Sequence, residues 1–290
     1  MTPSVVFRLG RVSNLPTVWT NALAGVVLAG GAIWTLTTLL VAIGLSLLYV
    51  SGMYLNDAFD RETDATERPG RPIPAGLASA DTVFFIGFLL MLAGLAFTLW
   101  GTTVSSATPW PGMLAALMLA GTILFYDWHH KGNALSHFFM GLCRVLAYIT
   151  AGYAAVQDPS PTLVVAALAS LSYLIGLTYI AKLESLDRIE GLWPLLFLSA
   201  PIIYGFAHLG PGGLASILLL AALVFWILLA LYLLKRRAKG DVARAVVSLI
   251  AGIALVDALF LAAAGAGAAA AIAVCCFALT LALQRWVSGT

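Results

Sequence analysis

The sequence predicts an all-α membrane protein, a polytopic bundle of nine or ten transmembrane helices. Hydrophobic residues make up 61% of the 290-residue chain and charged residues only 10%, against about 25% charged in a typical soluble domain. Apolar runs of roughly 20 residues, enough to cross a hydrocarbon core of about 30 Å as a helix, recur along the chain. The alternating pattern of a membrane β-barrel is not visible in the sequence, which leaves the helical class.

Apolar runs bounded by glycine, proline and polar residues predict ten helices. No linker or run of charge separates them, so residues 1–290 are expected to form a single membrane-embedded domain. Only Ala-Gly-Ala-Gly at 264–267 interrupts the run from Val242 to Trp286, which is either two spans or one bent helix and a surface segment. The expected helices are 16–32, 35–58, 80–101, 111–127, 134–156, 161–184, 191–208, 212–236, 241–262 and 266–286.

Apart from Arg144, inside the fifth expected helix, and Arg285, near the end of the last, lysine and arginine lie in or beside alternate connections between these helices. They precede the first helix and follow the second, fourth, sixth and eighth, whereas the connections near 33, 102–110, 157–160, 209–211 and 264 contain none. Basic loops stay on the cytoplasmic side of a membrane, so the N-terminus and the charged loops are predicted to be cytoplasmic. A net charge of only +2 argues against nucleic acid as a partner.

The second predicted helix ends in a concentration of oxygen ligands. Asn56, Asp60 and Asp64 follow at intervals of four residues, and Asp57 lies three before Asp60. On a helix these side chains share one face over about 12 Å. Their repulsion, which the helix dipole increases at a C-terminus, calls for a cation. Carboxylate and amide oxygens suit Mg²⁺, which bridges a few carboxylates to substrate phosphates; a solvated polar loop capped by Arg61 is the alternative.

A stiff basic loop follows the acidic stretch. Arg68 and Arg71 stand among three prolines in Arg-Pro-Gly-Arg-Pro-Ile-Pro, within reach of the carboxylate face. Guanidinium groups bind phosphate oxygens through paired N–H donors. Carboxylates, a metal and arginines together predict a site for a diphosphate group, and the neighbouring apolar helices offer shelter to a hydrocarbon tail.

These strings resemble the UbiA superfamily of intramembrane prenyltransferases. The resemblance implies about nine helices around a central cavity, Mg²⁺ as cofactor, and transfer of a prenyl group from an allylic prenyl diphosphate to a small, usually aromatic acceptor. Two further strings, at 13–21 and 140–144, are similar to an EboC-like bacterial branch, which implies a bacterial plasma membrane. The matching residues are Asn56-Asp57-x-x-Asp60-x-x-x-Asp64, Arg68-Pro-Gly-Arg71-Pro-Ile-Pro-Ala-Gly, Ser13 to Thr17, and Tyr126 to Lys131.

The resemblance also implies a second acidic motif at the end of the sixth helix. Glu184 and Asp187 stand there at i and i+3 and are expected to hold a second Mg²⁺ opposite the first cluster. The leading aspartate of the family motif is missing, because Leu177 and Thr178 occupy that neighbourhood. An ordinary charged helix end is the alternative interpretation.

Five further residues are candidates for substrate contacts. Lys131 matches a diphosphate-binding lysine of the family, or anchors the helix end at the membrane surface. Tyr126 is a candidate for stabilising cationic character through its ring face. Arg144, inside the fifth helix, either binds an anionic group of the acceptor or pairs with a carboxylate for structure. Arg11 and Asn14 are implied, by family analogy alone, to contact acceptor or diphosphate.

The predicted reaction is a Mg²⁺-dependent alkylation that releases diphosphate. The two loop arginines and Lys131 would stabilise the leaving group, and Asp187, Asp64 or the released diphosphate would take the acceptor proton. The catalytic candidates are therefore Asp60, Asp64 and Asp187. A CDP-alcohol phosphotransferase is excluded because its Asp-Gly-x-x-Ala-Arg signature is absent. The remaining alternatives are a prenyl-diphosphate-binding protein without turnover and a transporter, and polar residues gathered at one membrane face disfavour the latter.

Overall fold

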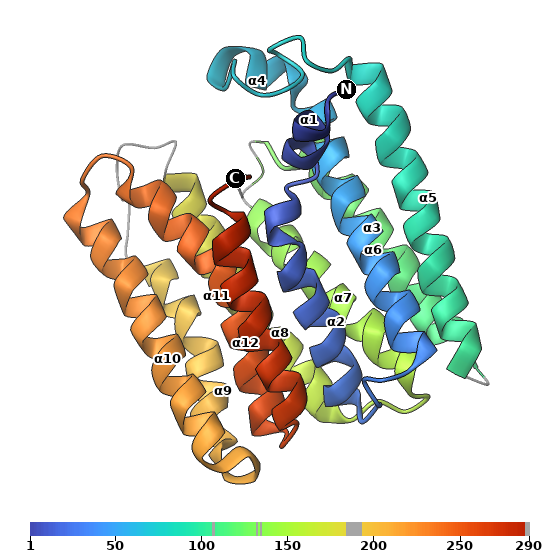
Figure 1. Cartoon of the computed structure of the whole chain (residues 1–290), viewed down its shortest axis with the longest axis vertical. Helices are drawn as coiled ribbons and strands as arrows, with labels where there is room; N and C mark the ends of the chain where they lie inside the picture. The colour runs from blue at the N-terminus through green and yellow to red at the C-terminus, as the bar shows by residue number, and fades with distance from the viewer. Residues whose placement is uncertain (106–107, 132, 134, 184–192, 288–290) are drawn as a thin grey trace.

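The computed structural model describes residues 1–105, 108–131, 133, 135–183 and 193–287, and within them the chain is helical without strands. Long helices run up and down through the bundle (Figure 1). The elements in chain order are α1 (Pro3–Leu9), the 3-10 helix η1 (Val12–Asn14), α2 (Leu15–Ala29), α3 (Leu36–Phe59), α4 (Arg61–Glu67), α5 (Ala80–Ser105), α6 (Trp110–His129), α7 (Ser136–Ala155), α8 (Pro161–Leu183), the 3-10 helix η2 (Trp193–Ser199), α9 (Ala200–Ala207), α10 (Leu209–Arg236), α11 (Asp241–Ala263) and α12 (Gly267–Leu283).

Each of the ten predicted helices has a helical counterpart, and the all-α membrane class is confirmed. Among the described helices, seven are long and apolar enough to cross a membrane, namely α3, α5, α6, α7, α8, α10 and α11. The other three are shorter: α2 has 15 residues, α12 has 17, and η2 with α9 forms one broken segment. A total of nine or ten spans therefore stays a prediction.

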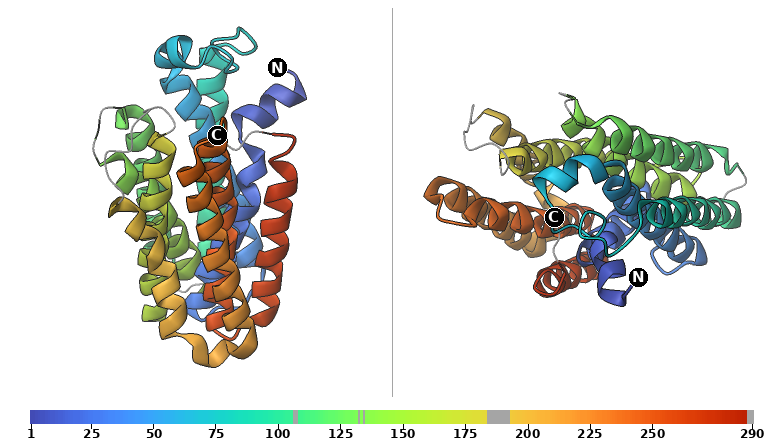
Figure 2. Two further views of the ribbon diagram at one scale, coloured as in Figure 1. Left: turned by 90° about the vertical axis from the view of Figure 1, so that its left-hand side faces the viewer. Right: turned by 90° about the horizontal axis from the view of Figure 1, so that it is seen from above.

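Two short helices, α1 and α4, were not expected from the sequence. Both lie at one end of the bundle, and α4 lies across that end when the molecule is seen from above (Figure 2). The Ala-Gly-Ala-Gly break at 264–267 forms a tight turn in which Gly265 has φ +77°. Residues 242–286 are thus two packed helices, α11 and α12, and the alternative of one bent helix is wrong.

Helix α11 forms the centre of one half of the bundle. It packs against α2, α8, α10 and α12, and nearly every side chain from Ala251 to Ala263 is buried. One of these buried side chains is charged, Asp257. A carboxylate inside an apolar helix requires polar partners from its neighbours.

Helices α3 and α5 approach each other closely because glycines line their contact. A Cβ on Gly44 would lie 2.1 Å from Thr98 Oγ1 and 2.8 Å from the carbonyl oxygen of Gly94. No larger residue fits there without moving a backbone. Small residues that bring helix backbones together are typical of membrane bundles.

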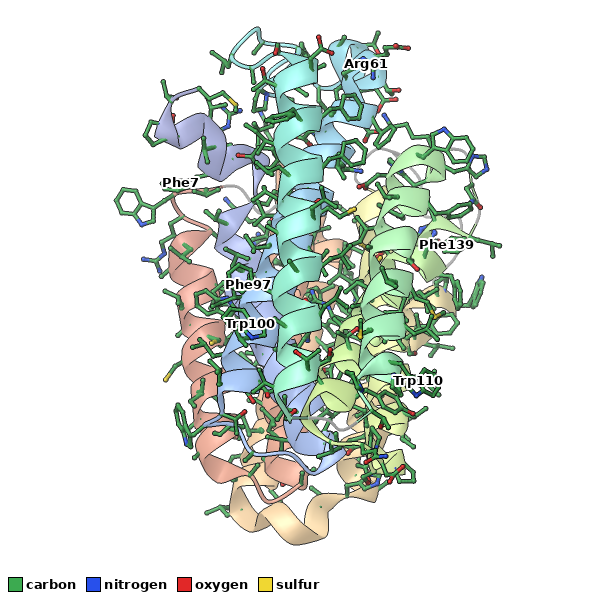
Figure 3. The ribbon with its side chains drawn as sticks, turned by 90° about the vertical axis from the view of Figure 1, so that its right-hand side faces the viewer. Phe7, Arg61, Phe97, Trp100, Trp110 and Phe139 are labelled. Atoms are coloured by element: carbon green, nitrogen blue, oxygen red, sulfur yellow. The ribbon has the colours of Figure 1, made fainter. Side chains whose placement is uncertain are left out.

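The outer surface is apolar, as expected for a protein surrounded by lipid. Helix α5 exposes Phe85, Leu92 and Trp100, and Trp110 at the start of α6 is 64% exposed. In Figure 3, Arg61 lies near the α4 end of the bundle, whereas Trp110 lies toward the other end and points outward. Such an apolar face, unsuited to water, suits a bilayer.

Within the described residues, the basic connections lie at the end that carries α4. The chain runs toward this end along α3, α6, α10 and α12 and away from it along α5, α7 and α11, and the N-terminus lies there as well (Figure 1). The C-terminal ends of α3 and α6, which carry the predicted site residues, therefore meet at the same end of the bundle.

Candidate active site

The acidic face predicted at the end of α3 is formed by two helices joined at a bend. Asp60 ends α3 and precedes α4, with φ −80° and ψ −3°. The helical hydrogen bonds continue across it: Asp60 N donates to Asn56 O at 2.9 Å, and Asp64 N donates to Asp60 O at 2.9 Å. Asn56, Asp57, Asp60 and Asp64 are all buried. The predicted spacing of four thus holds these side chains together.

Two arginines offset the charge of the acidic face. Arg71 Nη1 lies 3.0 Å from Asp57 Oδ1 and 2.7 Å from Asp64 Oδ2. Arg11 Nη2 approaches the same Asp57 oxygen at 3.3 Å, from a residue in the left-handed conformation (φ +42°) between α1 and η1. Arg8 donates to the carbonyl oxygen of Gly70 at 3.0 Å and so holds the proline-rich loop in place.

The residues that follow α6 supply two partners to Asp60. Lys131 Nζ lies 3.1 Å from Asp60 Oδ1, and His130 Nε2 lies 3.4 Å from Asp60 Oδ2. Burial alone would raise the pKa of Asp60, but the hydrogen bonds and charges of His130 and Lys131 outweigh it and hold the pKa below its ordinary value. Asp60 is therefore a carboxylate at neutral pH.

A cavity of about 310 Å³ opens beside these charges. Its mouth is polar, and its inner wall is apolar, formed by residues of α7, α8 and α11 such as Met140, Leu177 and Ile250. Asp57 does not line the cavity, because it lies behind Arg11 and Arg71. The sequence-predicted residues that do line it are Arg11, Asn14, Asn56, Asp60, Asp64, Arg68, Arg71, Tyr126, Lys131 and Arg144.

A second, apolar cavity of about 110 Å³ lies against the first. Residues of α3, α6 and α7, such as Leu48, Ile123 and Ala147, form its walls. Tyr126 and Arg144 are among the residues that line both cavities. The space beyond the charged mouth therefore suits an apolar chain.

Two residues of the site were not identified from the sequence. His130 contacts Asp60, stacks on Tyr126 with ring centroids 4.8 Å apart, and belongs to the site. Asp127 is buried. Its Oδ1 accepts a hydrogen bond from Asn56 Nδ2 at 3.2 Å, while its Oδ2 has no hydrogen-bond partner among the described residues. The available signal was the position of His130 four residues after Tyr126, which places both on one helix face.

The second acidic motif cannot be placed. Glu184 and Asp187 lie outside the described residues. Among the residues that are described, no three histidine, cysteine, aspartate or glutamate side chains gather in a metal-binding cluster. Mg²⁺ does not require such a cluster, because it keeps several waters and takes only one or two carboxylates together with substrate phosphates. Asn56, Asp60 and Asp64 offer oxygen ligands of that kind around the cavity mouth, so the donor set fits Mg²⁺.

Fold and cavity together define an intramembrane protein with a charged pocket at one end and apolar space behind it. The chain belongs to the UbiA prenyltransferase family, whose model matches residues 17–250. It is thus an integral membrane prenyltransferase.

Several relatives share this assignment. A digeranylgeranylglyceryl phosphate synthase of Halobacterium salinarum is 34% identical over 68% of each chain, and one of Methanopyrus kandleri is 28% identical over 68% of this chain and 69% of its own. A chloroplastic chlorophyll synthase of Oryza sativa is 29% identical over 66% of this chain and 52% of its own.

Solved structures confirm the fold. A UbiA homologue from Aeropyrum pernix K1, determined in its apo form, is 18% identical and covers 87% of this chain with a TM-score of 0.65. The match spans 96% of the Aeropyrum chain. At this identity the likeness concerns the fold alone.

Proposed function

We propose that the protein transfers a prenyl group from an allylic prenyl diphosphate to a small acceptor, with release of diphosphate and dependence on Mg²⁺. One observation carries the proposal: a single cavity joins a mouth of carboxylates, arginines and Lys131 to an apolar interior. A prenyl diphosphate has the same two halves, a strongly anionic head and an apolar tail.

The cations of the mouth bind the diphosphate. Arg68 lines the cavity and its side chain is exposed, while Arg71 and Lys131 stand at its edge paired with carboxylates. Asn56, Asp60 and Asp64 would hold Mg²⁺, which when bound neutralises charge on the phosphate oxygens as the leaving group departs. Metal bound by the carboxylates would free Arg71 and Lys131 for the phosphate oxygens.

The chain's own residues then favour C–O cleavage and alkylation. Positive groups aimed at the diphosphate stabilise the negative charge that grows as the bond breaks. The ring of Tyr126, which lines both cavities, stabilises positive charge on the allylic carbon. Apolar walls exclude water, which would otherwise capture that carbon. The acceptor forms the new bond to carbon and loses a proton to Asp64 or to the released diphosphate.

The acceptor and the setting complete the proposal. An aromatic acceptor rests on the family resemblance. The relatives' names point to different acceptors, since one is a digeranylgeranylglyceryl phosphate synthase and another a chlorophyll synthase. We place the protein in a bacterial plasma membrane with the cavity mouth facing the cytoplasm, which the collection of basic connections at that end supports.

Purified protein in nanodiscs, supplied with geranylgeranyl diphosphate and a lipid extract as acceptor source, tests the proposal. Diphosphate release that stops with a chelator and resumes with Mg²⁺ is expected, together with a prenylated product by mass spectrometry. Arg71→Ala should slow diphosphate release at low substrate concentration, because it weakens binding of the prenyl diphosphate. Arg61→Ala is the matched control, because Arg61 pairs with Glu62 at the surface and does not line the cavity. Binding of the diphosphate without any product would contradict the proposal.

A further inference from the structure

A chain of polar side chains crosses the interior of the bundle away from the mouth. Its members come from three helices: Thr20 and Asn21 from α2, Arg144 and Tyr148 from α7, and Asp257 from α11. All except Arg144 are buried completely, and none of these contacts was anticipated from the sequence. Polar groups at this depth are costly, so a chain of them calls for a function.

Asp257 is satisfied by neutral donors. Its Oδ2 accepts hydrogen bonds from Asn21 Nδ2 at 2.7 Å and from the Thr20 hydroxyl, and its Oδ1 accepts from the Tyr148 hydroxyl. Asp257 forms no ion pair with Arg144 in the described part of the chain. The carboxylate therefore orders its donors rather than neutralising the arginine directly.

Asn21 connects the carboxylate to the arginine. A carboxylate only accepts hydrogen bonds, so Asp257 fixes the Asn21 amide with its NH₂ group toward α11. The amide oxygen then faces Arg144, and Asn21 Oδ1 accepts from Arg144 Nη1. With the amide reversed, oxygen would face carboxylate and NH₂ would face guanidinium, and both contacts would be unfavourable.

Arg144 is consequently held at the edge of both cavities with donors left over. Its two hydrogen bonds within the described residues both use Nη1, one to Asn21 and one to the carbonyl oxygen of Thr17 at 3.2 Å. A guanidinium group has five N–H donors. Arg144 lines both cavities, whereas Asp257, Thr20 and Tyr148 line neither.

From this geometry we infer that Asp257 is a positioning residue for an anion-binding subsite at Arg144, acting through Asn21. The subsite takes a carboxylate or phosphate group carried by the acceptor; in this respect the inference rests on the proposed function. In a direct ion pair, the carboxylate of Asp257 would neutralise the positive charge of Arg144. Because Asn21 lies between the two groups, the charge of Arg144 stays available to a ligand. Asp257 is still close enough to offset part of the free-energy cost of burying the Arg144 guanidinium.

Binding to the purified full chain in detergent, measured by calorimetry, tests the inference without turnover. The probes are benzoate and phenyl phosphate, with benzamide as the neutral match and inorganic diphosphate with Mg²⁺ as the probe for the mouth. The wild type should bind at least one of the two anions more tightly than benzamide. Tighter binding of benzoate would identify a carboxylate subsite, and tighter binding of phenyl phosphate a phosphate subsite. Asp257→Asn should lower the affinity for the preferred anion by about tenfold or more and leave the affinity for diphosphate unchanged.

Thr20→Val serves as a second variant, because it removes one donor to Asp257 while keeping shape; a smaller loss in the same direction is expected. Asp257→Asn in an Arg144→Met background should cause no further loss. Equal binding of benzamide and both anions by the wild type, or unchanged anion affinity in Asp257→Asn, would overturn the inference. Either result leaves the proposed function standing, since that depends on Mg²⁺-dependent diphosphate release at the mouth.

Discussion

The same end of the bundle carries two clusters of arginine and aspartate that differ in how the charges are shared. At the α10–α11 connection, Arg236 donates hydrogen bonds from both Nε and Nη2 to Asp241, each at 2.7 Å. Ala238 N donates to Asp241 as well. At the cavity mouth, one nitrogen of Arg71 serves two carboxylates.

The difference separates a structural ion pair from the proposed binding site. Asp241 has its acceptors filled by the protein, lines neither cavity and fixes a turn. The mouth cations are held in place by carboxylates but stand against open space. Residue type and location are thus insufficient to recognise a site. The two clusters differ because the cations of the mouth line a cavity, whereas Arg236 and Asp241 do not.

The largest effect is expected from Asp60→Ala. We expect kcat to fall by at least about 100-fold, because the substitution removes a proposed metal ligand and the partner of Lys131. Diphosphate release with saturating Mg²⁺ is the measurement. Asp241→Asn is the matched control at the other cluster and should retain wild-type kcat. Full activity of Asp60→Ala would remove the metal assignment.

Arg71→Ala is expected to act mainly on binding. The KM for the prenyl diphosphate should rise by about 10- to 100-fold, because charge-assisted hydrogen bonds to phosphate are lost. Initial rates across substrate concentration measure it, with Arg61→Ala alongside. If KM stays constant while kcat falls, the arginine holds the carboxylates rather than the substrate.

The next largest effect is expected from a substitution that disturbs the packing between α3 and α5. Gly44→Ala places a Cβ against Thr98 and the Gly94 backbone, and we expect it to destabilise the fold by about 1–3 kcal/mol. Thermal unfolding in a fixed detergent measures this change. Gly121→Ala is the control, because a Cβ there meets no atom within 4 Å.

The smallest predicted effect concerns pH. Lys131 and His130 hold the pKa of Asp60 below its ordinary value, so the ionised form survives as the pH falls toward that lowered pKa. This carboxylate stabilises the fold above its unfolded-state pKa, and the contribution is lost as the pH drops through the folded one. In Lys131→Met the pKa of Asp60 should rise, moving the acid limb of the kcat/KM profile to higher pH. An unmoved limb would contradict the pairing.

Local periodicity explains how much of the site could be predicted. The face formed by Asn56, Asp60 and Asp64 follows from a spacing of four along a helix, which a bend at Asp60 does not destroy. The proline-rich loop indicated that Arg71 would lie near the same face. The bundle itself follows from apolar runs, because lipid demands helices long enough to cross it.

What was missed depends on contacts between distant parts of the chain. Asp257 meets Tyr148 109 positions away and Asn21 236 positions away, and no local pattern links such residues. His130 joins Asp60 only because α3 and α6 end at the same level. Helix α4 escaped prediction because its seven residues contain no apolar run, and membrane helices are recognised by apolarity.

The charged mouth is assembled almost entirely from the first 71 residues and the end of α6, whereas α7, α8 and α11 form much of the inner wall. Selection can therefore act on the two surfaces separately. Substitutions in the later helices can change which molecule accepts the prenyl group. The residues proposed to bind the departing diphosphate stay unchanged. A division of this kind gives a lineage a route to new products that begins with an already working enzyme.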